Sequence, residues 1–548
     1  MKKEWKILNK NPTGDIITSI LKLRNIRDPL HFLQPREEDL LPLTDLAHIE
    51  EAAKIVLKAI KENKKIFILG DVDNDGVSAN AIIYRYLKFF IDNVTWGINI
   101  GKRHGLLKEN LQEYVDKYDL IIAVDSSSEL FEEQQFLIDN GVQVIVLDHH
   151  PCEEKGIAVV VNSQFNHYRN KGLAGAGVTF KFVKYLDFLQ GTTYAEEYYD
   201  LAASGIIGDM MDVSEGSREN RYICAKGFAN LKNPGLKEII GKYNFDSTSV
   251  AFSISPTINA GVRMNRSELA AQLLLEDDKK EVKNIVKELK ELKVIQNIQK
   301  DVLVNKLNFT IKTNDLEKQK VIGLITEKNT SLAQGDITGL CANVLCDDYS
   351  CPVIIVHETD EEGVLQGSVR SEGVANFKDL VKQTKLVIFA KGHDEAFGIQ
   401  VKKENWASFI AKINERLKGV EFVKTNMADV VLEYKDITVN LIKKLEYVNQ
   451  ISGKGFNAIK VIIRGVEVND LTFMQHKHLK FSDNDMDFLK WNSSSEFEDF
   501  KSRTHGIYKT VDLIGKLQIG KFRGIQTKQM IIDDTSNFKD NLGFLRIR

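Results

Sequence analysis

The stretch from Lys65 to Gly76 constrains the fold more than any other part of the chain. Its first half is a short apolar run, typical of a strand that is buried on both faces. Asp71, Asp73 and Asp75 follow at every second position, and a helical pattern begins after them. Alternate side chains of an extended backbone share one face, so the carboxylates converge if the extended backbone continues past the strand. The stretch predicts a cation site at the edge of an α/β sheet, where a strand turns into a helix.

Two other interpretations of these carboxylates are an acidic surface loop and a calcium site. The pattern D-x-D-x-D-G also begins an EF-hand loop, which needs a glutamate at its twelfth position and a helix on each side. No glutamate stands at that position, and the preceding segment has the pattern of a strand. Both features disfavour an EF-hand.

Residues of the kind that bind metals also follow three later apolar runs. They are Asp125 after Leu120–Val124, Asp148-His149-His150 after Val142–Leu147, and Asp209 after the run from Gly205 to Gly208. A single aspartate at the end of a strand is most often a cap or turn residue. The carboxyl ends of parallel strands meet at one edge, however, so four such ends would bring these side chains together. Carboxylates and imidazole without thiolate favour Mn²⁺ or Mg²⁺ over structural zinc.

Composition limits the compartment and the kind of partner. A chain of 548 residues suggests roughly three or four domains. With 74 Lys+Arg against 77 Asp+Glu, any site for a polyanion must be a local patch. Five cysteines without a C-x-x-C spacing argue against a disulfide framework. The first residues lack the apolar core of a signal peptide, and no apolar run is long enough to span a membrane. We expect a soluble cytoplasmic protein without membrane contact.

The motifs, in their order along the chain, resemble those of the DHH phosphoesterase superfamily, and more narrowly the RecJ single-strand exonucleases. The four principal motifs are Gly70–Gly76, Val124-Asp125, Asp148–His150 and Gly208–Met210. Further similar stretches are Asn99–Leu106, Leu173–Val178, Ile258–Arg263, Gly367–Ser371 and Gly392–Gly398. The likeness covers nearly the whole chain. One departure is Leu69, which stands where the family commonly has a histidine.

The resemblance implies an α/β fold with two α/β domains joined by a long helix, followed by an OB-like β-barrel. The expected segments are an N-terminal arm (1–44), a parallel-sheet DHH catalytic domain (45–265), a connecting helix (266–310), a smaller DHHA1 substrate-binding domain (311–425) and an OB-like nucleic-acid-binding domain (426–548). Apolar residues at steps of three and four do predict a long amphipathic helix in the third segment. From periodicity alone, a surface helix packed on its own domain is equally compatible with that segment.

The resemblance also implies a metal-dependent exonuclease that degrades single-stranded DNA in the 5′-to-3′ direction in repair, recombination or replication. The residues themselves indicate neither polarity nor a preference for DNA over RNA. The expected enzyme is a monomer that uses two Mn²⁺ or Mg²⁺ ions, with a single-strand-binding protein or a helicase as possible partners. Bound ions would lower the pKa of a water and neutralise charge on the phosphate.

Individual roles follow from the same resemblance. The expected metal ligands are Asp71, Asp73, Asp75, Asp125, His149 and Asp209. Asp148 would hold the ring of His149 in its ligating tautomer, and His150 would face the scissile phosphate. The expected substrate-binding residues are Arg103, Arg263, Arg370, Ser371, Gly392 and His393. Their residue types suit this role, because glycine admits a close backbone approach and arginine offers a planar fork to phosphate.

Alternating strands near the C-terminus carry basic and aromatic residues that can follow a single strand by charge and stacking. These are Lys460, Arg464, Lys477, Lys480, Lys516, Lys521 and Arg523, with Phe481 and Phe522. Lysine-rich faces are also common on exposed strands without a ligand. If this region is a separate binding module, removing residues 426–548 should weaken binding to long strands while cleavage of very short strands survives.

Two other functions remain open at this point. A DHH phosphoesterase acting on short oligonucleotides or small nucleotides would not need the C-terminal barrel. A catalytically inactive scaffold in a replication complex would have lost ligands, whereas here the carboxylates and the histidine pair are intact.

Overall fold

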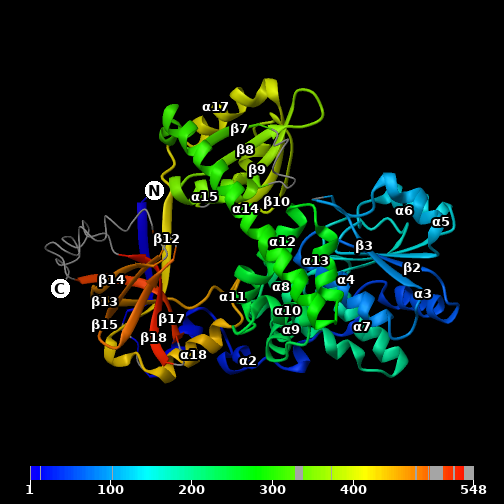
Figure 1. The fold of residues 1–548 in the computed structure, drawn as a ribbon, viewed down its shortest axis with the longest axis horizontal. Helices are drawn as coiled ribbons and strands as arrows, with labels where there is room; N and C mark the ends of the chain where they lie inside the picture. The colour runs from blue at the N-terminus through cyan, green and yellow to red at the C-terminus, as the bar shows by residue number, and fades with distance from the viewer. Residues whose placement is uncertain are drawn as a thin grey trace.

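Three sheets organise the computed structural model, which describes residues 2–10, 12, 14–101, 103–327, 337–371, 373–374, 376–474, 478–491, 493, 510–522 and 525–535. In Figure 1 they form three lobes: a parallel sheet with its helices in blue to green, a smaller mixed sheet in yellow-green, and a C-terminal sheet in orange and red.

The first sheet is parallel throughout, as the sequence predicted. Its strands, in spatial order, are β3 (Val94–Ile98), β2 (Ile66–Gly70), β4 (Leu120–Val124), β5 (Gln143–Asp148) and β6 (Val159–Asn162). Alternate residues of β2 enter two different cores: Ile68 packs in the same cluster as α3 (Ile49–Lys61), α4 (Asn74–Leu87) and α7 (Gly175–Gln190). Leu69 packs on the opposite side, with α5 (Leu111–Lys117) and α6 (Phe131–Asp139). Both faces are therefore covered, and the carboxyl edge carries the polar residues.

Further helices extend this first unit, which we call the parallel-sheet body (residues 49–275). They include α8 (Tyr199–Gly208), α9 (Arg218–Ala229), α10 (Pro234–Ile240), α12 (Ser255–Arg263) and α13 (Ser267–Leu275). The run from Gly205 to Gly208 was expected to end like the strands of the sheet, but it is the last turn of α8. The end of α8 is buried on all sides, so it lacks an amphipathic period, and a short apolar run of this kind is indistinguishable from a strand.

A single long helix, α14 (Lys279–Thr313, 35 residues), connects the first two lobes (Figure 1). Its N-terminal half packs into the core of the parallel-sheet body through Val282 and Leu289, and its C-terminal half packs into the core of the second lobe through Leu307 and Ile311. The expected start near residue 266 was too early, because Asp278 caps α14 by accepting from the backbone of Lys280 and Glu281. No helix in the described part of the chain is long and apolar enough to cross a membrane.

The second lobe, which we call the central lobe (residues 322–416), is built on a five-stranded mixed sheet. Its strands, in spatial order, are β10 (Val387–Gly392), β11 (Ala396–Lys402), β9 (Val364–Arg370), β8 (Val353–Glu358) and β7 (Ile322–Thr326). Only β7 and β8 are parallel to each other. Its helices are α15 (Thr338–Tyr349), α16 (Phe377–Lys382) and α17 (Trp406–Arg416).

The third sheet, the C-terminal sheet, has eight strands among the described residues. In spatial order they are β1 (Lys2–Asn9), β12 (Val423–Leu432), β13 (Val461–Glu467), β17 (Thr510–Phe522), β18 (Ile525–Thr535), β16 (Met486–Lys490), β15 (His478–Asp483) and β14 (Asn469–Met474). The segment expected as an N-terminal arm begins with a strand: its first residues form β1, which pairs in parallel with β12. Trp5 and Ile7 alternate onto one face beside Ala428, but the partner strand is too distant in sequence for a local pattern to reveal the pairing.

The C-terminal sheet and the parallel-sheet body share one hydrophobic core. Phe456, which follows α18 (Val439–Asn449), packs edge-on against Phe32 with ring centroids 4.8 Å apart. The buried guanidinium of Arg221 donates to the carbonyl oxygens of Phe32 (2.9 Å) and Ile451 (3.1 Å). These contacts join residues from the beginning, middle and end of the chain.

Candidate metal centre

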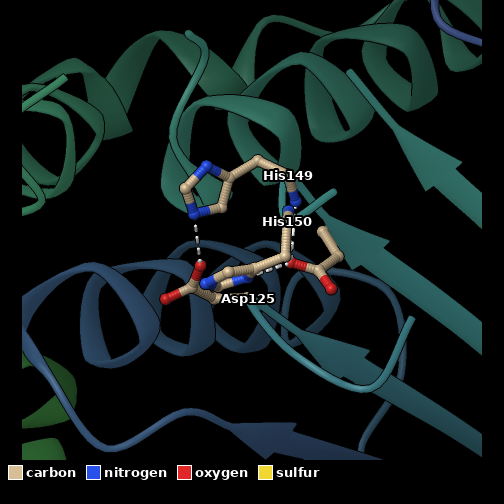
Figure 2. A group of neighbouring side chains, drawn as sticks. Asp125, His149 and His150 are labelled. Carbon is tan, nitrogen blue, oxygen red and sulfur yellow. Dashed lines mark hydrogen bonds and ion pairs between the residues drawn. The ribbon is translucent and has the colours of Figure 1, made fainter. Parts of the chain in front are cut away.

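The carboxyl edge of the parallel sheet gathers three of the predicted carboxylate ligands around the ring of His149, which is the fourth. Its Nε2 lies 3.2 Å from Asp125 Oδ1, 3.5 Å from Asp209 Oδ2 and 3.8 Å from Asp75 Oδ2. Figure 2 shows the ring of His149 pointing at the carboxylate of Asp125. Two groups able to hold an ion share this histidine: Asp75, His149 and Asp209, and Asp125, Asp148, His149 and His150.

The carboxylates after β2 reach the site by a different route from the one predicted. The backbone does not stay extended: Asp73 caps α4 by accepting from the backbone N–H groups of Asp75 (2.9 Å) and Gly76 (3.0 Å). Asp75 lies in the first turn of α4 and accepts from the N–H groups of Gly175 (2.7 Å) and Ala176 (2.9 Å). The start of α7 therefore fixes Asp75, and helix N-termini favour negative charge.

Burial and crowding make the cluster electrostatically unfavourable without a cation. Burial, together with the charge of Asp75, raises the pKa of Asp125 well above its usual value. Burial and neighbouring carboxylates also raise the pKa of Asp75 to about 7 and that of Asp209 to about 8. Burial and the charge of His150 lower the pKa of His149 to about 4, which favours the neutral imidazole that ligates metals. A cation among these groups would relieve the repulsion between the carboxylates.

Two orphaned atoms indicate where such a cation would bind. Asp125 Oδ1 and His149 Nε2 are buried, and neither has a hydrogen-bond partner among the described residues. Buried polar atoms are normally paired, so an unpaired oxygen and nitrogen facing each other need an explanation. The surrounding donors are carboxylate oxygens and imidazole, which suit Mn²⁺ or Mg²⁺. The residues present therefore fit the expected divalent ions.

Asp148 holds the ring of His150 instead of the expected ring of His149. Its Oδ1 accepts from His150 Nδ1 (2.8 Å) and from the backbone N–H of His149 (2.7 Å). Burial alone would raise the pKa of Asp148, but the hydrogen bond from His150 and the charges of both histidines lower it to about 2. The same hydrogen bond raises the pKa of His150 to about 9. The expectation failed because adjacent side chains after a strand point in different directions, and the carboxylate turns toward the more exposed ring.

Asp71 finds an imidazole partner that sequence reasoning missed. Leu69 points into the core on the opposite side of the sheet, and His104 Nδ1 lies 2.8 and 3.0 Å from the two oxygens of Asp71. The hydrogen bond to Asp71 raises the pKa of His104. His104 lies in a stretch that resembles the family, but no local signal connects it to β2. The only available clue was that Leu69 left Asp71 without a neighbouring histidine.

The predicted substrate-binding residues differ in their relation to this cluster. His393 follows Gly392, which has a φ of +128°, and the charge of His393 is one of those that lower the pKa of His149. The hydroxyl of Ser371, at the end of β9, is buried and has no hydrogen-bond partner in the described part of the chain. The neighbouring Arg370 donates to the carbonyl of Val369 (2.7 Å). The effect of His393 on His149 brings this part of the central lobe within electrostatic range of the cluster.

The other two arginines lie on the parallel-sheet body. Arg103 forms an ion pair with Glu109 (2.5 Å), outside the cluster, and Arg263 is the last residue of α12. Their roles stay predictions.

The predicted basic and aromatic track on the C-terminal sheet is only partly available. Phe481 is buried and stacks on Phe488 with an interplanar angle of 13°, so its expected contact with a base is wrong. Lys460 pairs with Asp533 (3.0 Å), and Lys480 pairs with Asp487 (3.1 Å). Lys477 and Arg523 lie outside the described residues, as do the side chains of Lys521 and Phe522.

We expect Gly175→Ala to weaken Mn²⁺ binding by at least about 10-fold, because an added Cβ would collide with the carboxylate of Asp125. The matched control is Gly172→Ala, whose Cβ would make only ordinary contacts, at 3.7 and 3.9 Å. Calorimetric titration with Mn²⁺ measures both variants. Unchanged affinity in Gly175→Ala would show that Asp125 does not need its observed position.

Comparison with known proteins finds relatives of this arrangement. Residues 65–206 match the model of the DHH family N-terminal domain, and residues 428–534 match that of the RecJ OB domain. The chain is 29% identical to the putative SPbeta prophage-derived single-strand DNA-specific exonuclease YorK of Bacillus subtilis, over 96% of this chain and 97% of that protein. It is 25% identical to the single-stranded-DNA-specific exonuclease RecJ of Bacillus subtilis, over 92% of this chain and 65% of that protein.

A solved structure shares the fold. The crystal structure of RecJ in complex with Mn²⁺ from Thermus thermophilus superposes with a TM-score of 0.79 at 24% identity, over 98% of this chain and 80% of that one. The matched domains, the full-length relatives and the shared fold agree with one another. The chain thus carries a DHH family N-terminal domain and a RecJ OB domain, and it resembles the RecJ exonucleases over nearly its whole length.

Proposed function

We propose that this protein is a single-strand-specific DNA exonuclease that hydrolyses phosphodiester bonds from the 5′ end with two divalent metal ions. The observation that carries the proposal is the buried cluster around His149, where unpartnered carboxylate and imidazole atoms converge. The relatives named as single-strand DNA-specific exonucleases supply the substrate class, and the family relation supports Mn²⁺ or Mg²⁺ as cofactor.

The chain's own residues divide the work in this proposal. Ions bound by Asp71, Asp73, Asp75, Asp125, His149 and Asp209 would lower the pKa of a coordinated water and neutralise charge on the phosphate. Asp148 orients the ring of His150 through the 2.8 Å hydrogen bond, so that an imidazolium can face the scissile phosphate.

The central lobe supplies the second side of the substrate site in this proposal. Arg370, Ser371, Gly392 and His393 hold the phosphates there, with Arg103 and Arg263 contributing from the parallel-sheet body. Because all of these groups come from one chain, a monomer suffices. A single-strand-binding protein or a helicase would act only as an accessory partner.

The alternatives are less well supported. An inactive scaffold would not need to keep carboxylates crowded enough to raise their pKa values, since that crowding opposes folding. An enzyme for small nucleotides would have no use for a C-terminal sheet that is built into the same core as the parallel-sheet body.

End-labelled single-stranded DNA and RNA, each labelled at either end, test the function directly. We expect Mn²⁺-dependent release of nucleotides from 5′-labelled single-stranded DNA and none in the presence of a chelator. Asp125→Ala and Asp209→Ala should abolish cleavage, because each removes a carboxylate from the cluster. Undiminished hydrolysis in the presence of a chelator would exclude the two-metal mechanism. Hydrolysis of RNA but not of DNA would exclude single-stranded DNA as the substrate.

A further inference from the structure

A glycine-flanked lysine from the C-terminal part of the chain docks on the segment that follows Asp209 of the metal cluster. The turn Gly453-Lys454-Gly455 follows α18 and precedes β13, yet it docks on the parallel-sheet body. The backbone N–H of Val213 donates to the carbonyl of Lys454 (3.0 Å). Two residues before Lys454, the N–H of Ser452 donates to the hydroxyl of Ser247 (3.1 Å).

The backbone of this turn is held in place on both sides of the lysine. Gly455 has a φ of +77°, and a Cβ there would collide with the carboxylate of Asp212, so the turn approaches more closely than another residue would allow. Phe456, the next residue, is buried in the shared core, and the guanidinium of Arg221 lies 5.1 Å from its ring centroid. Lys454 itself is exposed. A fixed backbone thus presents a solvent-accessible ammonium group.

The position of Lys454 relates it to both halves of the substrate site. Its backbone partner Val213 follows the ligand candidate Asp209 by only four residues. The positive charge of Lys454 interacts electrostatically with Asp209 on the parallel-sheet body and with His393 on the central lobe. No ion pair of Lys454 is found among the described residues, so its ammonium group is open to a further anionic partner.

We propose that Lys454 binds a backbone phosphate of the single strand next to the metal cluster, and that the C-terminal sheet thereby contributes a substrate-binding residue to the active site. The inference rests on the proposed function. The chain carries no overall basic excess, so it must concentrate positive charge where the phosphates lie. An ammonium on a flexible stem suits a non-specific phosphate contact, because it donates in several directions.

The test uses Lys454→Met and Lys454→Arg, with Lys117→Met as a control that removes the same charge from α5, where Lys117 pairs with Glu113. Single-stranded DNA cleavage in Mn²⁺ is measured over a range of salt concentrations, together with Mn²⁺ titration. We expect Lys454→Met to raise KM roughly 10-fold or more, as for loss of a charge-assisted hydrogen bond. The slope of log KM against log salt should fall by about 0.7, the value for one phosphate contact on a single strand. Lys454→Arg should restore both values, and Mn²⁺ affinity should not change.

Two results would overturn the inference: a KM and salt slope for Lys454→Met equal to those of the parent, or an equal change in Lys117→Met. The first would mark Lys454 as an ordinary solvated lysine. Because the residue is exposed, the variants should unfold at the parent's temperature; if Lys454→Met does not, Lys454→Gln replaces it in the same comparison. Failure of the parent protein itself to cleave single-stranded DNA would instead refute the proposed function.

Discussion

His149→Ala is expected to lose tight Mn²⁺ binding, whereas His150→Ala should keep the ions and still bind DNA but lose turnover by roughly 10²-fold or more. The two rings are adjacent in sequence but differ in environment. His149 is buried, and its unpartnered Nε2 faces Asp125 at 3.2 Å. His150 is more exposed and uses Nδ1 to donate to Asp148. A group that acts on charge developing in the transition state lowers kcat more than binding when it is removed.

The measurements are calorimetric Mn²⁺ titration and single-turnover cleavage of a single-stranded substrate. His357→Ala is the matched control, because His357 pairs across the sheet with Gln366, several residues along β9 from Arg370. If His150→Ala cleaves at the parent's rate, or loses the metal as severely as His149→Ala, the proposed division between the two histidines is wrong.

The part of the site formed by the carboxyl ends of the parallel strands could be predicted, because local sequence patterns identify those strands. The runs ending at Gly70, Val124 and Leu147 are short, apolar and flanked by helical patterns, which indicates buried parallel strands. Parallel strands place their carboxyl ends together, so the sequence alone assigns Asp125 and His149 to one site, and the 3.2 Å between their side chains agrees with that assignment.

The helical part of the site could not be predicted in the same way. Asp75 and Asp209 belong to the first turn of α4 and the end of α8, but both follow apolar runs that look alike in sequence. Asn74 shows what decides the geometry: its side-chain amide donates to the carbonyl of Ser204 (2.8 Å) and thereby ties α4 to α8. Hydrogen bonds of this kind join residues more than a hundred positions apart, and no local periodicity encodes them.

The same limit explains why His104 and Lys454 were missed. Each lies in a loop whose backbone is fixed by distant contacts: the N–H of Leu106 donates to the hydroxyl of Ser127, and the carbonyl of Lys454 accepts from Val213. A lone histidine or lysine in a loop does not stand out in the sequence as a functional residue. Its position relative to the cluster becomes visible only when the packing of the loop is known.

Removal of residues 426–548 is expected to unfold the parallel-sheet body, so cleavage of very short strands should be lost together with binding to long ones. The sequence suggested a separable module, but the structure shows a shared core. Deletion would expose the surface of Phe32 that packs on Phe456 and leave the buried Arg221 without the carbonyl of Ile451. It would also remove Asp429, whose carboxylate pairs with Arg24 at 2.6 Å. Breaking a fully buried pair costs about 3–5 kcal/mol, so the loss of this partly buried one, added to the other lost contacts, is a large share of a typical domain stability of about 5–15 kcal/mol.

Two variants separate the structural role of the C-terminal sheet from its role in DNA binding: the truncated chain and full-length Arg464→Ala. Each is examined by scanning calorimetry and by cleavage of short and long single strands. Arg464 is exposed, so its replacement removes one candidate phosphate contact without touching the core. Arg464→Ala should unfold at the parent's temperature and cleave short strands at the parent's rate. A truncated chain that also unfolds cooperatively and cleaves short strands at that rate would show that the sheet is separable after all. In that case the parallel-sheet body would be stable without the hydrogen bonds that Val213 and Ser247 form with the C-terminal part of the chain. Lys454 would then contribute only to the binding of long strands.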